Sequence, residues 1–572
     1  MPQNALHKLY RNSGLCVFAA LLLSLTAAQA QATLANQNKR GLRAFSIEGV
    51  LRLQEEDIDL GTAALILSRE WGTEKTLHIY RRKIDDMAEA IQRTLAEKRL
   101  PTDYRALPVI NAYLFDTMGY RSVETADDPE DLFLHVVLDR KRGYCLSLSI
   151  LYLAVGERLG LPLYGVVAPG HFFVRYDDGK QKINIETTSQ GAFVEDQYYL
   201  DKFKPPKRPQ TLYMKNLTRR QTLGCFYNNL GNSYTKVGDD AAAFAAIERA
   251  VTLAPQLGEA RTNLGNMYFR RQMPQKAIAE YEQAIALMGQ DAVAYNNMGS
   301  AYLQLKNYAK AEVCLKTAID LQADYTEAYR NLATIYLARE EFDKAIAELK
   351  KAAAVKPQEP ATFLLLAQAN RQAGNLAQAA DYYQKVLSLW PEQVEAQIGL
   401  GWVELEQNQP QRAMDRFNAA LSQQPNSAMI YFGLAQCRHA MGQTDQEIAA
   451  YQRALEIDPT MTAALQNLGN AYMAAGRYDQ AAALYRKAIQ TEPSNAALHY
   501  NLGVAAARQK KHREAIDAFS EAISLEPDNA AAYNGLAIAY YQLQDFEKAY
   551  DFALKAKSLG FEVQDVLLKK RN

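Results

Sequence analysis

The sequence is short of the residues that keep a chain unfolded, and it has no excess of charge of either sign. Among 572 residues there are only 30 glycines and 19 prolines, while 48% are apolar. This composition excludes long disordered tracts and collagen-like structure, because the chain can bury large cores. The 64 basic and 64 acidic side chains cancel, so the chain lacks the basic excess on which sequence-independent nucleic-acid binding depends. We therefore expect no nucleic-acid partner.

Cysteine is scarce as well, with five residues in the whole chain. Cys16 lies in an N-terminal apolar segment, and Cys145, Cys225, Cys314 and Cys437 are far apart. A chain of this size does not need disulfides for stability, so we expect these four to be free thiols. No His, Cys, Asp and Glu spacing is typical of metal ligands, and no glycine-rich phosphate loop is present. The sequence therefore predicts neither a metal nor a cofactor.

The first thirty residues have the pattern of a secretory signal peptide. Lys8 and Arg11 precede an apolar run over 15–25, and small residues follow it up to Ala30. The run is too short to cross a bilayer comfortably, which disfavours the alternative of a membrane anchor. We expect cleavage after a signal peptide over 1–30 and a periplasmic or secreted protein. No later segment has 18 consecutive apolar residues, so we expect no membrane span after cleavage.

The region over 224–561 repeats with a period of 34 residues. A Leu or Met recurs ten times in register, and a Gly or Ala always follows it. The recurrent positions are Leu230, Leu264, Met298, Leu332, Leu366, Leu400, Leu434, Leu468, Leu502 and Leu536. This closely resembles the tetratricopeptide repeat (TPR), in which each unit is a pair of antiparallel helices. The resemblance implies an all-α superhelical solenoid of ten repeats that holds proteins or extended peptides in a groove. The apolar tail over 562–572 is expected to form a capping helix.

One set of repeat positions carries asparagine. The residue before the recurrent Leu or Met is Asn229, Asn263, Asn297, Asn331, Asn467 or Asn501, and a second asparagine follows at Asn232, Asn266 and Asn470. Helical periodicity puts these amides near the groove. Matching asparagines in peptide-holding TPR proteins bond to the main chain of the guest, so the resemblance implies a peptide-binding ladder. The alternative is that asparagine is simply common at these positions of the repeat. Leu365, Gly399 and Gly433 interrupt the ladder, so the middle of the groove is predicted to be more apolar.

A different pattern fills residues 43–203. Helical segments over 57–70 and 75–98 precede Gly143-Tyr-Cys-Leu-Ser-Leu-Ser, then Pro169-Gly-His-Phe-Phe-Val-Arg and an acidic strand that ends at Glu186. These segments resemble the bacterial transglutaminase-like family that includes the SirB1-type proteins. The resemblance implies an α+β fold of the transglutaminase or papain-like class, with a cysteine nucleophile.

Cys145, His171 and Glu186 are the candidate catalytic residues. Cys145 begins an apolar helix, where the positive end of the helix dipole favours a thiolate. His171 can accept the thiol proton and return it to a leaving amine, and Glu186 can orient the imidazole. The family usually has aspartate at the third position, so the longer glutamate is a departure. The alternative is a buried structural cysteine and a hydrogen-bonded core histidine.

Other polar residues of this region have ordinary explanations. His135 is expected in the core or on a helix face, and Asp177 and Asp178 are expected in a turn. The basic, proline-rich stretch that starts at Lys202 predicts a stiff linker over 204–223, with a second linker over 31–42. Its positive charge, which extends to Arg219 and Arg220, is more typical of a solvated surface than of a site for an anionic partner.

Two functions are compatible with these features. The first is an exported acyltransferase or peptidase that acts on amide carbonyls, by hydrolysis or transamidation, in peptides or proteins that the repeats recruit. The second is a non-enzymatic scaffold, in which the cysteine domain only contributes a peptide-binding pocket. The three candidate catalytic residues favour the first function, and the large size of the repeat array favours the second.

Overall fold

The computed structural model describes residues 46–70, 77–123 and 129–569, and the structural statements below concern these residues. The expected signal peptide over 1–30 and linker over 31–42 lie outside them. The chain divides into two compact units, Met1–Ala323 and Asp324–Asn572. The first unit holds an α/β region and three helix pairs, and the second holds seven helix pairs.

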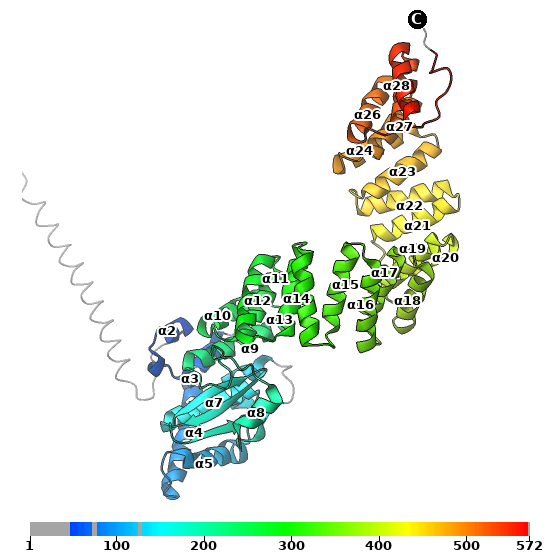
Figure 1. Ribbon diagram of the computed structural model, residues 1–572. Coiled ribbons are helices and arrows are strands. Elements are labelled where there is room, and N and C mark those ends of the chain that lie inside the picture. The colour runs from blue at the N-terminus through cyan, green and yellow to red at the C-terminus, as the bar shows by residue number, and fades with distance from the viewer. Residues whose placement is uncertain (1–45, 71–76, 124–128, 570–572) are drawn as a thin grey trace, which may run out of the picture. The chain divides into compact units, whose positions relative to one another are not determined.

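The α/β region has one main antiparallel sheet with helices against it (Figure 1). The strands follow the order β3-β4-β5-β6, and they are β3 (Leu163–Ala168), β4 (His171–Asp177), β5 (Lys182–Glu186) and β6 (Ala192–Val194). A short parallel pair joins β1 (Arg121–Ser122) to β2 (Arg142–Gly143). The helices are α2 (Ile47–Leu51), α3 (Leu60–Glu70), α4 (Leu77–Glu97), α5 (Leu107–Asn111), α6 (Leu134–Arg140), α7 (Cys145–Leu159) and α8 (Asp196–Phe203). The α+β class that the sequence predicts is confirmed.

Strand β4 is buried on both faces because helices cover both sides of the sheet. Successive side chains of a strand point to opposite faces. Phe172, Val174 and Tyr176 therefore join the core that contains α7, whereas Phe173 packs with Tyr199 of α8. Helix α7 is buried along most of its length, which explains why its sequence has no polar face.

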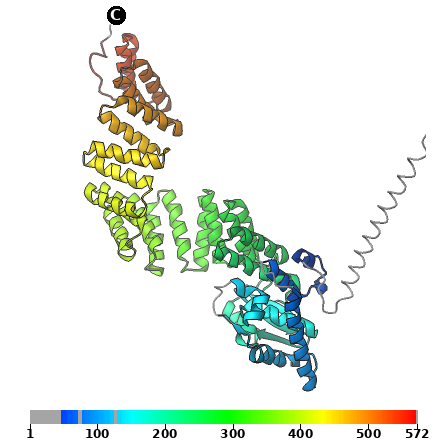
Figure 2. The same ribbon diagram turned by 180° about the vertical axis from the view of Figure 1, so that it is seen from behind.

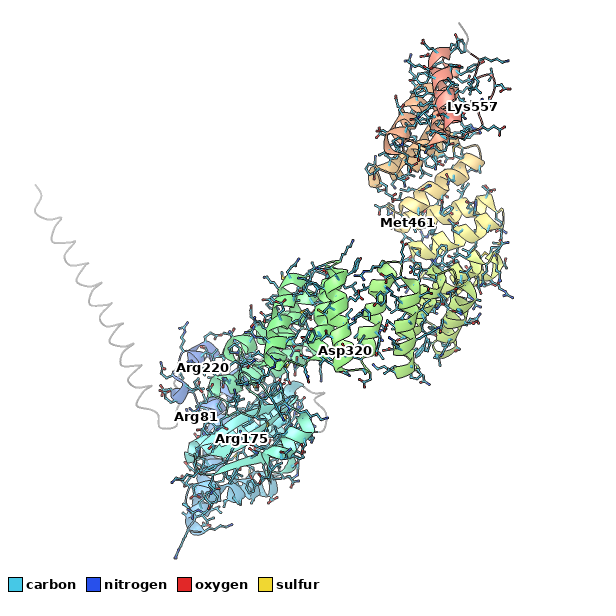
Figure 3. The ribbon with its side chains drawn as sticks, viewed as in Figure 1. Arg81, Arg175, Arg220, Asp320, Met461 and Lys557 are labelled. Atoms are coloured by element: carbon cyan, nitrogen blue, oxygen red, sulfur yellow. The ribbon has the colours of Figure 1, made fainter. Side chains whose placement is uncertain are left out.

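Arg175, labelled in Figure 3, connects the sheet with its surroundings. Its side chain is buried and donates hydrogen bonds to Asn184 Oδ1 at 2.7 Å, Asp196 Oδ1 at 2.6 Å and the Met214 carbonyl at 2.8 Å. A buried guanidinium needs such partners, because an unpaired charge in the interior is costly. The bonds join β4, β5, α8 and the segment that follows α8.

The linker expected over 204–223 differs in the structure. Residues 204–218 pack along the edge of β3, where the Met214 and Leu217 amides donate to the carbonyls of Val167 and Gly165, both at 2.9 Å. The first repeat helix then begins at Arg219, because Thr218 and Gln221 form a reciprocal capping box with bonds of 3.2 and 2.9 Å.

The two arginines at the start of this helix are also not a solvated surface. Arg219 Nε donates to Glu157 Oε1 at 2.8 Å, and Arg220 Nη2 donates to the carbonyls of Leu51 and Leu53. These contacts hold the first repeat against the α/β region, so the expectation of a solvated charge cluster is wrong for this pair. The two lie within one compact unit.

Twenty consecutive helices follow, and they alternate within 34-residue repeats as the sequence predicts. In the first unit they are α9 (Arg219–Val237), α10 (Asp240–Leu253), α11 (Gly258–Arg270), α12 (Pro274–Met288), α13 (Ala292–Gln304) and α14 (Tyr308–Leu321). In the second unit they are α15 (Thr326–Ala338), α16 (Phe342–Val355), α17 (Pro360–Gln372), α18 (Leu376–Leu389), α19 (Val394–Glu406), α20 (Pro410–Gln423), α21 (Ala428–Ala440), α22 (Thr444–Ile457), α23 (Thr462–Ala474), α24 (Tyr478–Thr491), α25 (Ala496–Arg508), α26 (His512–Leu525), α27 (Ala530–Gln542) and α28 (Phe546–Ser558). Within each unit, neighbouring pairs stack in chain order (Figure 2).

The recurrent Leu-Gly pair explains the packing of a repeat. Leu264 is 4% exposed and lies in the core. A Cβ atom added at Gly265 would lie 2.5 Å from the Tyr281 ring, so the glycine is what lets the two helices of the pair approach. The middle repeats place Trp402 in an aromatic cluster, with its ring 5.2 Å from that of Phe417.

The helical expectations need small corrections at their ends. The segment expected over 57–70 begins at Leu60, because Asp59 Oδ1 caps the helix by accepting from the Thr62 amide at 2.9 Å. Helix α4 covers most of the range expected over 75–98. The expected capping helix over 562–572 is instead a pair of turns over 565–568. The segment is too short to form a stable helix, and among its described residues, 562–569, only Leu567 is buried, against Ala537 and Ala553. These last two residues belong to the final repeat.

Candidate functional site

Cys145 is the first residue of α7. The helix begins here because Ser147 Oγ accepts a hydrogen bond from the Tyr144 amide at 2.8 Å, which satisfies a backbone donor at the end of the helix. Cys145 is partly exposed. Its thiol therefore lies at the positive end of a buried helix dipole and is accessible from outside.

His171 opens strand β4 directly after a turn. Gly170 has a φ of +68°, a backbone conformation that residues with a Cβ atom rarely adopt. This conformation reverses the chain after β3, since Ala168 pairs with His171 across the hairpin. The turn thus places the imidazole at the end of the sheet that faces the start of α7.

Glu186, at the end of β5, completes the group. Its Oε2 atom lies 2.7 Å from His171 Nε2, and it also accepts from the Tyr199 hydroxyl at 3.0 Å. Its Oε1 atom accepts from the Thr188 amide at 3.1 Å and from the Thr188 hydroxyl. Glu186 is 3% exposed. The Glu186 side chain is longer than the aspartate usual in the family, but these four hydrogen bonds hold it in one orientation. The glutamate can therefore orient the imidazole.

The charges of these groups depend on one another. Burial opposes a positive charge on His171, but hydrogen bonds to Cys145 and Glu186 outweigh it and raise the pKa of His171 to about 9. Burial alone would raise the pKa of Glu186, yet its bonds to His171 and Thr188 lower that pKa below the usual value. Since Glu186 occupies Nε2, the other ring nitrogen, Nδ1, is left for the thiol. The structure therefore brings all three candidate catalytic residues together.

Two aromatic rings support the imidazole. The Phe203 ring stacks on His171 with centroids 4.8 Å apart and planes within 5° of parallel. Tyr199 lies 6.1 Å away in the same stack and bonds to Glu186. Both come from α8, and the sequence analysis did not identify either. Their one signal in the sequence is that Tyr199 and Phe203 are four positions apart, which puts both on one side of a helix.

The candidate residues open into a cavity of about 300 Å³. Its other wall comes from the first two repeats, so the site is not formed by the α/β region alone. The lining residues from the repeats are Cys225, Asn228, Asn229, Asn232, Leu257, Glu259 and Asn263. A second cavity of about 1010 Å³ shares Glu259 and Asn263 with the first.

The predicted asparagines fall into different environments. Asn229 and Asn263 line the cavity of Cys145 and His171. Asn297 instead donates to Asn266 Oδ1 at 2.8 Å, within the repeats. The remaining three, Asn331, Asn467 and Asn501, lie on α15, α23 and α25 of the second unit.

Glu259 connects the repeats with the catalytic histidine turn. Its Oε1 atom accepts a hydrogen bond from the Gly170 amide at 3.0 Å. Burial raises the pKa of Glu259, against the hydrogen bonds from Gly170 and Tyr213. No signal in the sequence marks this residue, because its role depends on how the second repeat docks on the hairpin. The bond fixes the residue that precedes His171.

The other candidates have structural roles. His135 is 7% exposed and packs edge-on against Tyr80 at 5.8 Å, as the sequence predicts. Asp177 and Asp178 accept hydrogen bonds from amides of the turn, at 3.0 Å from Gly179 and 2.8 Å from Lys180. These residues are therefore not members of the candidate site.

Thiols, metal ligands and membrane-spanning helices are described here for the residues that the structure covers. Cys225, Cys314 and Cys437 are buried free thiols, as expected, and Cys145 is a free thiol as well. Within 46–70, 77–123 and 129–569 no three His, Cys, Asp or Glu residues are grouped so that they could hold a metal ion. In the same residues no helix has the length and apolar character needed to cross a membrane.

Comparison with known families agrees with both regions of the chain. Residues 78–224 match the transglutaminase-like superfamily. Tetratricopeptide repeat families match 226–257, 265–306, 290–358, 370–430, 428–461, 467–525 and 507–544. The chain thus carries a transglutaminase-like domain followed by an array of tetratricopeptide repeats. Such an array suggests binding of proteins or peptides, and the combination supports a protein-interaction scaffold.

Individual relatives each match part of the chain. A UPF0162 protein of Xylella fastidiosa is 32% identical over 131 residues, which are 22% of this chain and 46% of that protein. The mouse F-box only protein 21 is 30% identical over 105 residues, which are 18% of this chain and 16% of that protein. The match thus spans about half the length of the bacterial relative. Among solved structures, human IFIT1, as a dimer with PPP-AAAA, is 17% identical with a TM-score of 0.36, covering 59% of this chain and 91% of that one.

Proposed function

We propose that the protein is a cysteine acyltransferase that acts on amide carbonyls of peptides or proteins bound by its repeats. The observation that carries this proposal is the arrangement of Cys145, His171 and Glu186 at one open cavity. A partly exposed thiol at a helix start, a histidine beside it and a carboxylate behind the histidine are the parts of a nucleophilic triad. The environment of each residue differs from that of a structural cysteine or an ordinary core histidine.

The geometry supports a two-stage reaction. The Cys145 thiolate attacks the carbonyl carbon and forms a C–S bond. As the C–N bond breaks, the His171 imidazolium gives its proton to the nitrogen, so that ammonia or an amine leaves. Neutral His171 then takes a proton from water or from an acceptor amine, which attacks the thioester and restores the thiolate. Water yields a carboxylic acid, and an amine yields a new amide.

The leaving group distinguishes the reactions open to this site. We would treat soluble protein extract with the full chain or with its Cys145→Ala variant, and measure released ammonia and new amino termini by mass spectrometry. Ammonia that depends on Cys145 indicates reaction at side-chain carboxamides, and new termini indicate cleavage of the main chain. If neither product depends on Cys145, the acyltransferase proposal is wrong.

The second candidate is a scaffold without catalysis. It is favoured by the twenty repeat helices, α9 to α28, which make up more of the chain than the α/β region. In that case the cavity at Cys145 binds a peptide without reacting with it. Partners would then bind equally well to the wild-type chain and to Cys145→Ala, and neither chain would change them chemically.

The third part of the proposal is export. It is supported by the charged head, apolar run and small residues of the first thirty positions. We expect the mature chain to begin just after Ala30 and to lie in the periplasm or outside the cell. Terminal sequencing of protein from intact, fractionated cells tests this. A chain that retains Met1 in the cytosol would remove this assignment.

A further inference from the structure

Four side-chain amides form one wall of the cavity at Cys145. Asn228, Asn229 and Asn232 come from α9, and Asn263 comes from α11. Cys145 and His171 line the same cavity of about 300 Å³. The amides therefore lie where the part of a substrate next to the reacting carbonyl would bind.

The hydrogen bonds of these amides are incomplete. Asn228 is 5% exposed, and its Oδ1 atom accepts from Asn263 Nδ2 at 2.9 Å. Among the residues that the structure describes, Asn228 Nδ2 has no hydrogen-bond partner, nor do the side chains of Asn229 and Asn232. Asn229 is half-buried and Asn232 is exposed, so both amides are accessible to a ligand. Asn228 lines the cavity next to the nucleophile, so its Nδ2 donor is a group that a ligand bound there can satisfy.

The following repeat uses the same motif differently. Asn263 and Asn266 repeat the Asn-Leu-Gly-Asn pattern of Asn229 and Asn232. Asn266 Oδ1, however, accepts both from Asn297 Nδ2 at 2.8 Å and from the Tyr281 hydroxyl at 2.8 Å. Those amides are used within the protein. The incomplete bonding at the cavity is therefore a property of this place and not of the repeat motif.

The lining of the cavity also limits the charge of the ligand. An amide side chain both donates and accepts hydrogen bonds, which matches the N–H and C=O groups of a peptide main chain. No Lys or Arg lines this cavity, and Glu259 contributes a carboxylate. An anionic segment would be repelled by Glu259 and would find no cation, whereas a neutral peptide segment satisfies the amides.

We propose that Asn228, Asn229, Asn232 and Asn263 form the acyl-donor subsite, which holds the main chain of a neutral peptide segment beside Cys145. This inference rests on the proposed acyltransferase function and extends it, because it assigns substrate positioning to the first repeats. The repeats then not only recruit a substrate at a distance but also form part of the catalytic cavity.

Two alkylating reagents separate recognition from reactivity. Iodoacetamide is small and reports the reactivity of Cys145 alone. N-acetyl-trialanyl chloromethyl ketone alkylates the same thiol but carries a peptide main chain that the subsite would hold. We would measure the second-order rate constant of each reagent at Cys145 in the full chain by peptide mass spectrometry. We expect saturable reaction with the peptide reagent, and slower reaction when glutamate replaces the alanine next to the ketone.

The variants are a double substitution, Asn229→Ala with Asn232→Ala, and its matched control, Asn467→Ala with Asn470→Ala. The control pair has the same Asn-Leu-Gly-Asn motif in a repeat of the second unit. Two amide hydrogen bonds lost at the cavity should slow the peptide reagent about 10-fold. Iodoacetamide should react at nearly the wild-type rate with both double variants.

Each outcome has a separate meaning. If the peptide reagent reacts equally fast with the cavity variant and the control variant, while iodoacetamide still labels Cys145, the subsite is wrong and the acyltransferase proposal is unaffected. If the cavity variant slows both reagents by the same factor, the amides stabilise the fold of the site and do not bind substrate. That result also overturns the subsite. If neither reagent labels Cys145 in the wild-type chain, the acyltransferase proposal itself fails.

Discussion

At the scale of single residues, the accessibility of Cys145 distinguishes it from the other thiols. Burial raises the pKa of Cys314 to about 11 and that of Cys437 to about 12, and it raises the pKa of Cys225 further. These thiols are both shielded and held in the unreactive protonated form. Cys145 is partly exposed and lies beside His171. Its chemistry is therefore not that of a packing residue.

The first prediction is that iodoacetamide modifies Cys145 at least about 10-fold faster than the other three thiols at neutral pH. The reason is the combination of exposure and a neighbouring imidazolium. Peptide mass spectrometry after timed labelling measures all four rates at once. The His171→Ala variant is the control, in which Cys145 alone should slow. Labelling of Cys145 at the same rate as Cys314 would contradict the assignment of a nucleophile.

The second prediction concerns the proton on His171. Nuclear magnetic resonance of histidine-labelled protein should show its midpoint near pH 9, above the usual value of about 6.5. Glu186→Gln should move the midpoint down, because the negative charge that favours the imidazolium is lost. A wild-type midpoint near 6.5 would show that the ion pair does not form.

The same titration predicts how stability depends on pH. The pKa of His171 is raised in the folded chain. Its contribution to the free energy of unfolding is therefore complete below about pH 6.5 and is lost as the pH rises to about 9. The pKa of Glu186 is lowered, so its contribution is present above about pH 4.3 and is lost in more acidic solution. The pair therefore stabilises the fold most between these two limits, near pH 5 to 6.

At the scale of elements, the site depends on contacts between the β3–β4 hairpin and the second repeat. Glu259 of α11 accepts from the Gly170 amide at 3.0 Å, directly before His171. A hydrogen bond that involves a charged group contributes about 1.5 to 3 kcal/mol. Glu259 acts on His171 through the Gly170 amide, so we regard it as a positioning residue.

The third prediction separates positioning from charge at this residue. Glu259→Ala should slow iodoacetamide labelling of Cys145 by about 10-fold and lower the His171 midpoint, because the histidine turn loses its anchor. Glu259→Gln keeps a carbonyl oxygen for the Gly170 amide, so it should restore most of the rate. Equal behaviour of the two variants, or a changed melting temperature with an unchanged His171 midpoint, would show that Glu259 has only a structural role.

The fourth prediction concerns the core of a repeat. Leu264→Ala should lower the free energy of unfolding by about 2 to 5 kcal/mol, because it leaves a cavity at a residue that is 4% exposed. Denaturant unfolding followed by circular dichroism measures the change. Arg270→Ala on the same helix is the control, since its side chain is 53% exposed and should cost less than about 0.5 kcal/mol. Equal effects would mean that the recurrent leucine is not a core position.

At the scale of the whole molecule, the sequence predicts the two regions well because each has a local signal. The 34-residue period carries Leu264 and Gly265, whose packing follows from size alone. The motifs around Cys145 and His171 specify a helix start and a strand start, and the sheet brings those two elements together. These features need no knowledge of how distant parts of the chain dock.

The residues that the sequence analysis missed are those whose role depends on docking. Asn228, Glu259 and Phe203 look like ordinary helix residues in the sequence, and they become part of the site only where helices meet the histidine turn. The linker expectation was wrong for two reasons: residues 204–218 dock on the edge of β3, which the sequence does not reveal, and the capping box of Thr218 and Gln221 is a local signal of a helix start that was overlooked beside the prolines. The 34-residue period also does not distinguish the asparagines that line the cavity from those that bond to other repeat residues, because both kinds follow the same period.

The proposed acyl transfer requires Cys145 to carry the acyl group as a thioester. The direct measurement is acid quenching of the full chain after brief mixing with p-nitrophenyl acetate, followed by peptide mapping. We predict one equivalent of p-nitrophenolate in a burst and one acetyl group on Cys145, which hydroxylamine removes and which the Cys145→Ala and His171→Ala variants do not acquire at a comparable rate. Acetyl groups only on other residues, or the same burst in Cys145→Ala, would contradict it.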